Sequence, residues 1–589
     1  MKNFLSSLLA TIIGILIMTL VLFFIILGIV AASTSREVPE VKENSLLLVK
    51  LNARIIDRTN DDPFANLYSG MFLYDQTMGL NQILKDLDKA ATDEHIKGIF
   101  MNMGAVSAGM ATLGEIREAL IDFKESGKFI YAYGDNFTQK SYYLASVADS
   151  IFMTPQGAFL FTGMSAEVMF YKNALEKAGV EMQVIRHGSY KGAVEPFLRT
   201  DLSEENREQI EGYVGALWGS LVEGISESRD IPVEELNRLA DELATIDPAN
   251  LVESGMIDGL IYYEEMLSFL KEKMGVEEED DLEGISLKSY KDVPDKKKKE
   301  VSRDKVAVIY AMGSVVDGSA GEGFIGSERI SKALRKARRD KSVKAIVFRI
   351  NSGGGSGMAS DVIHHEVQLA AEAKPLVVSM GDVAASGGYY IAAPADTILA
   401  SPSTITGSIG VFGVFPSVEE LMTEKIGITT DVVKTNTHAN LGSVMDPLDP
   451  SERAILQKMV DQFYTNFVHI VADGRAMSYE DVDAIAGGRV WAGKDALDLG
   501  LVDAHGGLEK AIKLAAGMAD LEQYRVQSLP KLDDPMTALM KQITGSSLSR
   551  AQNLIRKELG ADYQHYKRLQ EIRNMRGIQA IMPYELIIH

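Results

Sequence analysis

The longest uncharged apolar run lies at the start of the chain, over residues 4–32. About 20 helical residues span the hydrocarbon core of a bilayer, so this run predicts a transmembrane helix. The apolar part of a cleaved secretion signal has only about 7–15 residues, which favours an uncleaved anchor. The small residues at 30–33 leave cleavage open as the alternative. Because no second run of this length follows, we expect the chain from about residue 45 to fold on one side of the membrane.

Beyond the anchor, the pattern alternates between two kinds of segment. Short apolar runs rich in β-branched residues occur at 306–310, 345–348 and 376–378, and such runs are typical of strands buried on both faces. Residues 330–338 and 361–373 instead repeat their apolar positions every three or four residues, which predicts amphipathic helices. Strands that alternate with helices indicate an α/β fold with a largely parallel sheet.

The chain also repeats itself. Residues 131–165 align without a gap with residues 378–412, at a constant offset of 247, and ten of these 35 positions are identical. Shorter matches extend the duplication in both directions, so we expect two similar domains at 45–270 and 305–520.

Two segments lie outside the duplicated halves. The charge-rich segment 271–304 is predicted to be an exposed linker. The tail, 521–589, has a Gly/Ser break at 545–547 and then a helix-like pattern over 550–573. The sequence assigns this tail no role.

Composition excludes several classes of function. The formal net charge is −22, whereas nucleic-acid binding needs a basic face, so no nucleic-acid partner is expected. The chain has no cysteine, which excludes disulfides, thiolate nucleophiles and cysteine-ligated metals. We expect neither a metal nor another cofactor.

Two glycine-rich clusters follow predicted strands, at 349–356 and 381–390. In the first, glycines allow backbone N–H groups to approach a ligand closely, and the helix that follows adds its dipole, which suits an oxyanion. Neither Gly-x-Gly-x-x-Gly nor a Gly-Lys-Ser/Thr ending is present, so a phosphate loop is disfavoured. The second cluster presents Ser386 at a tight strand-to-helix turn, although many Ser-Gly-Gly turns are only turns.

Together these clusters, with Thr406-Gly407-Ser408-Ile409-Gly410, resemble the signal peptide peptidase A family, in its long, duplicated bacterial type. The resemblance covers about residues 1–520. It implies two tandem ClpP/crotonase-like domains, with Ser386 as nucleophile and Gly354 in the oxyanion hole. Residue 353 is glycine where the family often has proline, which bears on the rigidity of that loop.

A serine hydroxyl needs a neighbouring base, and the sequence offers two kinds. His364 and His365 are adjacent on a predicted helix and so point in different directions; surface or packing roles suit them better. The resemblance implies a lysine instead. Aligning Val432-Val433 with Val184-Ile185 places Ala439 opposite Lys191, so the lysine position is filled in the half without the serine.

The other site positions show the reverse pattern. Gln139 stands opposite Ser386, and Ser107 stands opposite Gly354. Each half has lost what the other keeps, which is expected if both halves build one site. Asp135 and its counterpart Asp382 occur in both halves, which indicates a structural role.

The expected mechanism sets conditions on Lys191. A free lysine has a pKa of about 10.4 and is protonated at neutral pH, but burial away from carboxylates lowers that pKa. Lys191 should therefore be buried beside Ser386, whereas most of the 60 Lys and Arg side chains must lie on the surface. The resemblance implies that Ser408 hydrogen-bonds and orients the lysine.

The resemblance also implies a biological setting: a protease of the bacterial inner membrane that contacts membrane lipid through its N-terminal helix. Its catalytic part faces the periplasm and degrades leftover signal peptides and other apolar peptides. The resemblance further implies a homo-oligomer, in particular a tetramer, and leaves open whether Lys191 and Ser386 meet within one chain or between two. Two alternatives remain: a crotonase-like acyl-binding enzyme and a non-catalytic membrane scaffold.

Overall fold

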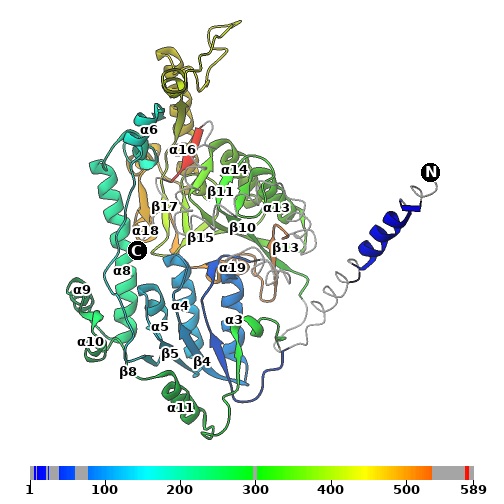
Figure 1. The fold of residues 1–589 in the computed structure, drawn as a ribbon, viewed down its shortest axis with the longest axis vertical. Helices are drawn as coiled ribbons and strands as arrows, with labels where there is room; N and C mark the ends of the chain where they lie inside the picture. Colours follow the sequence, from blue (N-terminus) through cyan, green and yellow to red (C-terminus); the bar gives the residue numbers. More distant parts are fainter. Residues whose placement is uncertain are drawn as a thin grey trace.

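A computed structural model gives the fold of the chain (Figure 1). The residues that it describes are 6–7, 9–21, 24, 39–59, 77–295, 302–532 and 578–582. Residues 9–21 are helical, and their large apolar side chains are exposed. Within these described ranges, no helix has both the length and the apolarity needed to cross a membrane. Much of the predicted anchor at 4–32 lies outside the described residues, so the anchor stays a prediction.

The N-terminal half forms a six-stranded parallel sheet in the order β8-β6-β5-β4-β1-β9. Its central strands carry apolar side chains on both faces because helices cover both sides. The strands are β1 (Ser45–Val49), β4 (Ile96–Met103), β5 (Phe129–Gly134), β6 (Ser150–Met153), β8 (Gly259–Leu260) and β9 (Gly284–Ser286). The principal helices are α3 (Leu80–Thr92), α4 (Met110–Glu125), α5 (Gln139–Ala145), α8 (Glu204–Arg229) and α11 (Tyr263–Met274).

The C-terminal half repeats this plan in the order β19-β17-β15-β13-β10-β21, with β16 and β20 branching from β15. Its strands are β10 (Lys305–Met312), β13 (Val343–Ser352), β15 (Leu376–Ala385), β16 (Thr397–Ala400), β17 (Ile405–Gly407), β19 (Val490–Ala492), β20 (Ala504–His505) and β21 (Arg525–Leu529). Its principal helices are α13 (Ser327–Arg339), α14 (Gly357–Ala371), α16 (Pro450–Arg475) and α19 (Leu508–Met518). The predicted α/β fold with largely parallel sheets is confirmed, and so are the strands and helices read from the pattern of this half.

The sheet of each half ends in an edge strand that lies beyond the predicted boundary of that domain. In the first half β9 pairs in parallel with β1, and in the second β21 pairs in the same way with β10. The segment 271–304 is therefore only partly an exposed linker, because it contains β9 and the fully buried Tyr290. The tail likewise contributes β21, while its helix-like stretch 550–573 lies outside the described residues. Such short edge strands carry too few apolar positions to stand out from a charged background.

A third sheet joins the two halves. Its order is β12-β11-β14-β22-β18-β7, formed by β12 (Phe324–Gly326), β11 (Ser314–Val316), β14 (Gly354–Ser356), β22 (Ile578–Ile581), β18 (Phe412–Ser417) and β7 (Glu181–Arg186). Only β7 comes from the first half, and it pairs antiparallel with β18, with Arg186 opposite Phe412. Because of this pairing, the residues that follow β7 lie within the second half.

A buried ionic cluster forms a second joint. The fully buried guanidinium of Arg349, on β13, donates through Nε to Asp57 Oδ1 and through Nη2 to Glu115 Oε1, both at 2.6 Å. Both carboxylates belong to the first half. A buried cation needs such partners because desolvation of an unpaired charge is costly. Asp382, in the second half, also contacts the first half. Its carboxylate accepts hydrogen bonds from the N–H and the hydroxyl of Thr112, in the first turn of α4.

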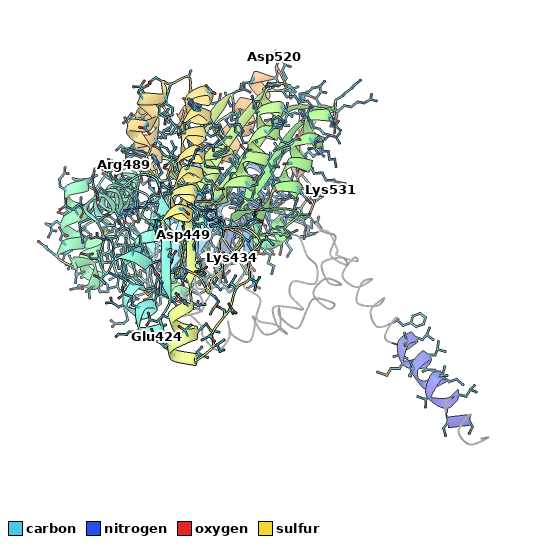
Figure 2. The ribbon with its side chains drawn as sticks, turned by 90° about the horizontal axis from the view of Figure 1, so that it is seen from above. Glu424, Lys434, Asp449, Arg489, Asp520 and Lys531 are labelled. Carbon is cyan, nitrogen blue, oxygen red and sulfur yellow. The ribbon has the colours of Figure 1, made fainter. Side chains whose placement is uncertain are left out.

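Residues 418–446, between β18 and α16, reach away from the sheets at one edge of the molecule (Figures 1 and 2). They include the short π-helix η3 (Leu421–Ile426), and Figure 2 shows its Glu424 at the margin of the ribbon. The alignment of Val432-Val433 with Val184-Ile185 matches 429–434 with β7, yet these residues form no strand and Val433 is 98% exposed. Within the described residues, the counterpart of β7 is thus not part of a sheet.

Candidate active site

The β7–β18 pairing places Lys191 in the core of the second half. After β7 the chain turns inward, and Lys191 precedes the short 3-10 helix η1 (Gly192–Val194). Its backbone packs against Gly488, where an added Cβ would lie 2.7 Å from the Lys191 nitrogen, Cα and Cβ; Gly488 also has φ of +90°. Glycine at 488 is therefore required by both the close approach and the backbone conformation.

The Lys191 amine meets three oxygens. Its Nζ lies 2.8 Å from Ser386 Oγ, 2.9 Å from Ser408 Oγ and 2.9 Å from the Ser408 carbonyl oxygen. A neutral amine has two N–H donors and one lone pair. Both N–H groups can therefore donate to Ser408 while the lone pair accepts from the Ser386 hydroxyl.

Burial sets the charge state of this amine. Lys191 is fully buried, and desolvation lowers its pKa well below the ordinary lysine value. Lys89 provides a contrast within the described ranges, because this nearly buried lysine lies 3.2 Å from the carboxylate of Asp86. Lys191 has hydroxyl and carbonyl neighbours instead, and these do not balance a positive charge.

Ser386 stands at a strained turn between β15 and the short helix α15 (Gly387–Tyr390). Its φ and ψ are 55° and −116°, a conformation that a residue with a side chain adopts only when its surroundings enforce it. The parallel pairing of β15 with β17 provides that constraint, since the Ser386 N–H donates to the Gly407 carbonyl at 2.8 Å. The hydroxyl has a second, longer contact with the Gly410 carbonyl at 3.5 Å.

Gly354 lies beside the turn that carries Ser386. A Cβ at Gly354, which has φ of +98°, would lie 2.7 Å from the Gly387 nitrogen and 1.9 Å from the Ala580 oxygen. The Gly354 N–H donates to Ser352 Oγ at 3.1 Å. The structure thus brings together all four residues singled out from the sequence, namely Lys191, Gly354, Ser386 and Ser408.

The described residues of the first half form no equivalent site. Gln139, opposite Ser386, begins α5, and its amide oxygen accepts from the N–H groups of Thr162 and Gly163. Ala439, opposite Lys191, lies in the exposed segment between β18 and α16. His364 packs edge-on against Tyr390, and burial lowers its pKa. These contacts fit structural roles.

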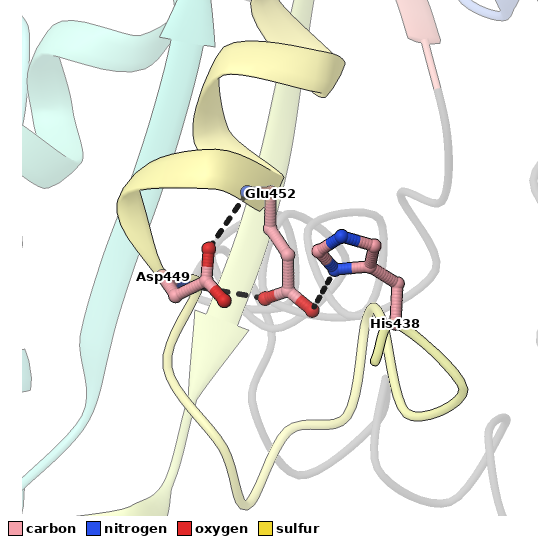
Figure 3. Close-up of side chains that lie close together, drawn as sticks. All are labelled: His438, Asp449 and Glu452. Carbon is pink, nitrogen blue, oxygen red and sulfur yellow. Dashed lines mark hydrogen bonds and ion pairs between the residues drawn. The ribbon is translucent and has the colours of Figure 1, made fainter. Parts of the chain in front are cut away.

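One further group has the composition of a metal site. His438, Asp449 and Glu452 present ligand atoms within 4.8 Å of one another (Figure 3). Asp449 is, however, the N-cap of α16: its Oδ1 accepts from the Ser451 and Glu452 N–H groups, and Glu452 accepts from the Asp449 N–H. This capping box accounts for both carboxylates, and His438 adds a contact of 3.4 Å to Glu452.

Three features of the site escaped the sequence reasoning. Gly488 forms the wall behind Lys191, Gly387 contributes the backbone nitrogen next to the nucleophile, and Arg349 ties the two halves together. Only Gly387 had a usable signal, because it directly follows the candidate nucleophile. The contacts of the other two join residues far apart in the sequence.

Comparison with known proteins fits this geometry. The family model of Peptidase family S49 matches residues 122–277 and 368–522, one segment in each half. The fold and the two matched segments define a peptidase whose family domain is duplicated. The chain belongs to Peptidase family S49.

Similar proteins share most of the chain. Protease 4 of Salmonella typhi is 35% identical over 549 residues, covering 90% of this chain and 88% of its own. The chloroplastic serine protease SPPA of Arabidopsis thaliana is 33% identical, covering 92% and 78%. An Enterococcus faecium protein named as a signal peptide peptidase SppA is 34% identical over 30% of this chain and 52% of its own. A solved ClpP1 of Listeria monocytogenes matches 35% of this chain and 94% of its own at 17% identity, but the TM-score of 0.24 carries no argument.

Proposed function

We propose that this chain is a membrane-anchored serine endopeptidase in which Ser386 is the nucleophile and Lys191 the general base. The observation that carries the proposal is the fully buried Lys191 Nζ, 2.8 Å from Ser386 Oγ and without a carboxylate among its hydrogen-bond partners in the described chain. Membership of Peptidase family S49 and the Protease 4 relatives support the same reaction class.

The mechanism follows from the protonation state. The neutral amine of Lys191 takes the Ser386 proton as Oγ attacks the peptide carbonyl. The hydroxyl and carbonyl oxygens of Ser408 accept hydrogen bonds from both N–H groups of the Lys191 amine, so the lone pair of this amine stays directed at Ser386 Oγ. The resulting ammonium gives its proton to the leaving amine, which yields an acyl-enzyme. Lys191 then accepts a proton from water, and the hydroxide equivalent releases the second product.

Backbone N–H groups serve as the oxyanion donors in this proposal. The Gly387 nitrogen begins α15 beside Ser386, and Gly354 lies next to it. The Gly354 N–H donates to Ser352 Oγ, so it must turn away from that hydroxyl to serve. Each such donor contributes about 3–4 kcal/mol to transition-state stabilisation in well-studied hydrolases.

The proposed substrates are leftover signal peptides and other apolar peptides. Their chemistry suits a small apolar cluster beside the dyad, formed by Ala193, Val194, Phe412 and Val414. The name of the Enterococcus relative points to the same substrate class. The predicted helix at 4–32 would hold the enzyme at the inner membrane, with the catalytic halves in the periplasm.

We further propose a homo-oligomer, specifically a tetramer. Within the chain β7 pairs with β18, and the duplication gives each a counterpart: 429–434 for β7 and 165–170 for β18. Neither counterpart forms a named strand. Copies that each pair 429–434 with 165–170 of a neighbour would repeat the internal contact head to tail, and such an assembly forms a ring where the rotation between neighbours closes.

The decisive experiment compares wild type with Ser386→Ala on a fluorogenic apolar peptide and on a synthetic signal peptide in detergent. The variant should lose at least about 1,000-fold in kcat, because the covalent step is removed. Ser146→Ala is a matched control, since the buried Ser146 Oγ donates to the Tyr143 carbonyl at the end of α5 in the first half. Equal turnover by wild type and Ser386→Ala would remove the protease assignment. Turnover of the short peptide alone would keep the protease and reject signal peptides as substrates.

A further inference from the structure

The loop that precedes β19, residues 486–489, lies between two segments of the candidate site. Its Gly487 carbonyl accepts from the Tyr190 N–H at 3.2 Å, and Tyr190 is the residue before the proposed base. Its Arg489 carbonyl accepts from the N–H of Ser408, the residue that orients the amine, at 2.6 Å. The backbone of one short loop thus contacts the first half and the second half on either side of the dyad.

The side chain of Arg489 reinforces the contact with the first half, and Arg489 lies where the two halves meet (Figure 2). Its guanidinium carbon is 4.8 Å from the centroid of the Tyr190 ring and 4.2 Å from the centroid of the Trp491 ring. Arg489 Nη2 donates to Glu208 Oε1, on α8, at 2.7 Å, and Nη1 donates to the Tyr190 hydroxyl at 3.3 Å. The Tyr190 hydroxyl donates to Glu208 Oε2 at 3.0 Å. We call these three residues, Arg489, Tyr190 and Glu208, the Arg489 clasp.

The clasp has little value for stability. The side chain of Glu208 is 55% exposed, and exposed ion pairs contribute little to the free energy of unfolding. Its position is more informative, because Tyr190 is one residue from Lys191. A catalytic group that moves by 1 Å loses up to about 100-fold in rate. A weak contact at this place therefore acts on the reaction far more than on the fold.

The backbone around the clasp has support of its own. Gln209, the next residue on α8, donates through Nε2 to the Tyr190 carbonyl at 3.0 Å. Its Oε1 accepts from the Val490 N–H at 2.9 Å. Because these bonds do not involve the Arg489 side chain, a chain with another side chain at 489 should still fold.

We propose that Arg489 is a positioning residue for the proposed dyad. Its side chain holds Tyr190, which fixes the base, and its carbonyl holds Ser408, which fixes the orienting hydroxyl. Among the described residues, the Arg489 side chain bonds to neither Ser386 nor Lys191, so it acts through its neighbours. The inference rests on the proposed function, because it assigns Arg489 a part in that reaction.

The test replaces Arg489 by methionine and measures kcat and KM on a fluorogenic peptide across pH. We expect kcat to fall by about 10- to 100-fold with KM unchanged, because the clasp acts on the base and not on the substrate. Burial lowers the pKa of Lys191, so a loosened Tyr190 that admits water should move the rising limb of the rate to higher pH. The midpoint of this limb does not depend on how much enzyme is folded, so a merely structural loss leaves it unmoved.

Lys494→Met is the matched control. Lys494 and Glu223 form an exposed ion pair at 3.5 Å, which also joins the second half to α8. This variant loses an ion pair between the same two parts of the molecule, but away from the dyad. It should keep the wild-type kcat and the wild-type midpoint, and thermal melts of both variants show whether each is folded.

Tyr190→Leu tests the contact itself, because it removes the ring without changing the charge. It should lower kcat and raise the midpoint much as Arg489→Met does. The double variant should be no worse than the weaker single variant by more than about twofold, since the two substitutions remove one shared contact. Independent effects that multiply, or a midpoint that moves in Arg489→Met alone, would overturn the role of Tyr190 and with it the clasp.

The remaining outcomes separate this inference from the proposed function. A wild-type kcat and midpoint in Arg489→Met overturn the positioning role, even if Ser386→Ala is inactive and the enzyme is a protease. A lower kcat with an unmoved midpoint also overturns it, because lost folding would then explain the loss. Full turnover by Ser386→Ala overturns the proposed function, and this inference falls with it.

Discussion

Replacement of Lys191 by methionine removes the proposed base while keeping the buried stem. Methionine is unbranched and close to lysine in length, so it should fill the same space beside Gly488. Among the described residues, the Ser386 hydroxyl then keeps the Gly410 carbonyl at 3.5 Å, which can accept a hydrogen bond but not the proton. General-base catalysis contributes about 100- to 10,000-fold to rate. We therefore expect kcat/KM to fall by that factor, or about 3–5 kcal/mol in activation free energy.

The same change should raise stability, which separates lost chemistry from lost folding. Burial lowers the pKa of Lys191, so below the ordinary lysine pKa of about 10.4 the unfolded chain binds a proton more readily than the folded chain. Stability therefore falls as pH drops below about 10.4, until Lys191 is protonated in the folded state too. Lys191→Met has no buried amine to lose a proton on folding, so it should melt at a higher temperature than wild type near pH 7. This difference in melting temperature should disappear above about pH 10.4.

The assay is kcat/KM on a fluorogenic peptide across pH, paired with thermal melts. In wild type the rate should rise with pH to a midpoint below the ordinary lysine pKa, and this limb should vanish in the variant. Lys374→Met is the control: burial also lowers the pKa of Lys374, but its amine donates to the Ala337 and Asp340 carbonyls, each at 2.7 Å. If Lys191→Met kept more than about a tenth of the wild-type kcat/KM while Ser386→Ala was inactive, another group would be the base.

Two further substitutions test the scaffold. Gly488→Ala places a Cβ 2.7 Å from Lys191 atoms and should lower kcat up to about 100-fold, since displacing a catalytic group by 1 Å costs about that much. The control is Gly427→Ala, because Gly427 has a similar φ of +82° but a Cβ there would meet nothing within 4 Å. This control variant should retain activity. If both variants lost activity equally, backbone strain rather than the contact with Lys191 would be responsible. Arg349→Met leaves two buried carboxylates without a cation and should cost about 3–5 kcal/mol, which lowers Tm by about 6–20 °C for a domain of this size. Arg199→Met, whose carboxylate partner is exposed, should barely change Tm in the same calorimetric scan, and an equal loss for both would contradict the argument.

Sequence alone determined much of this protein. Apolar runs with β-branched residues identified β10, β13 and β15, because strands buried on both faces leave a local signal. The family resemblance pointed to Ser386, and the duplication then placed Lys191 at the family's lysine position in the half without that serine. The strands were predicted from residues that are neighbours in the sequence, and Lys191 was found from the alignment of the two repeats. Both kinds of signal can be seen in one sequence.

Tertiary structure decided what depends on contacts between distant segments. The strand pair β7–β18 determines that Lys191 and Ser386 meet within one chain, which the duplication left open. The Arg349 cluster and the glycine at 488 likewise acquire their roles only when the halves pack together. The strand β22, short and apolar like many others, acquires its place only by pairing with β14 and β18. The physical reason is common to all of these: hydrogen bonding and burial act through space, and the sequence records only the side chains that take part.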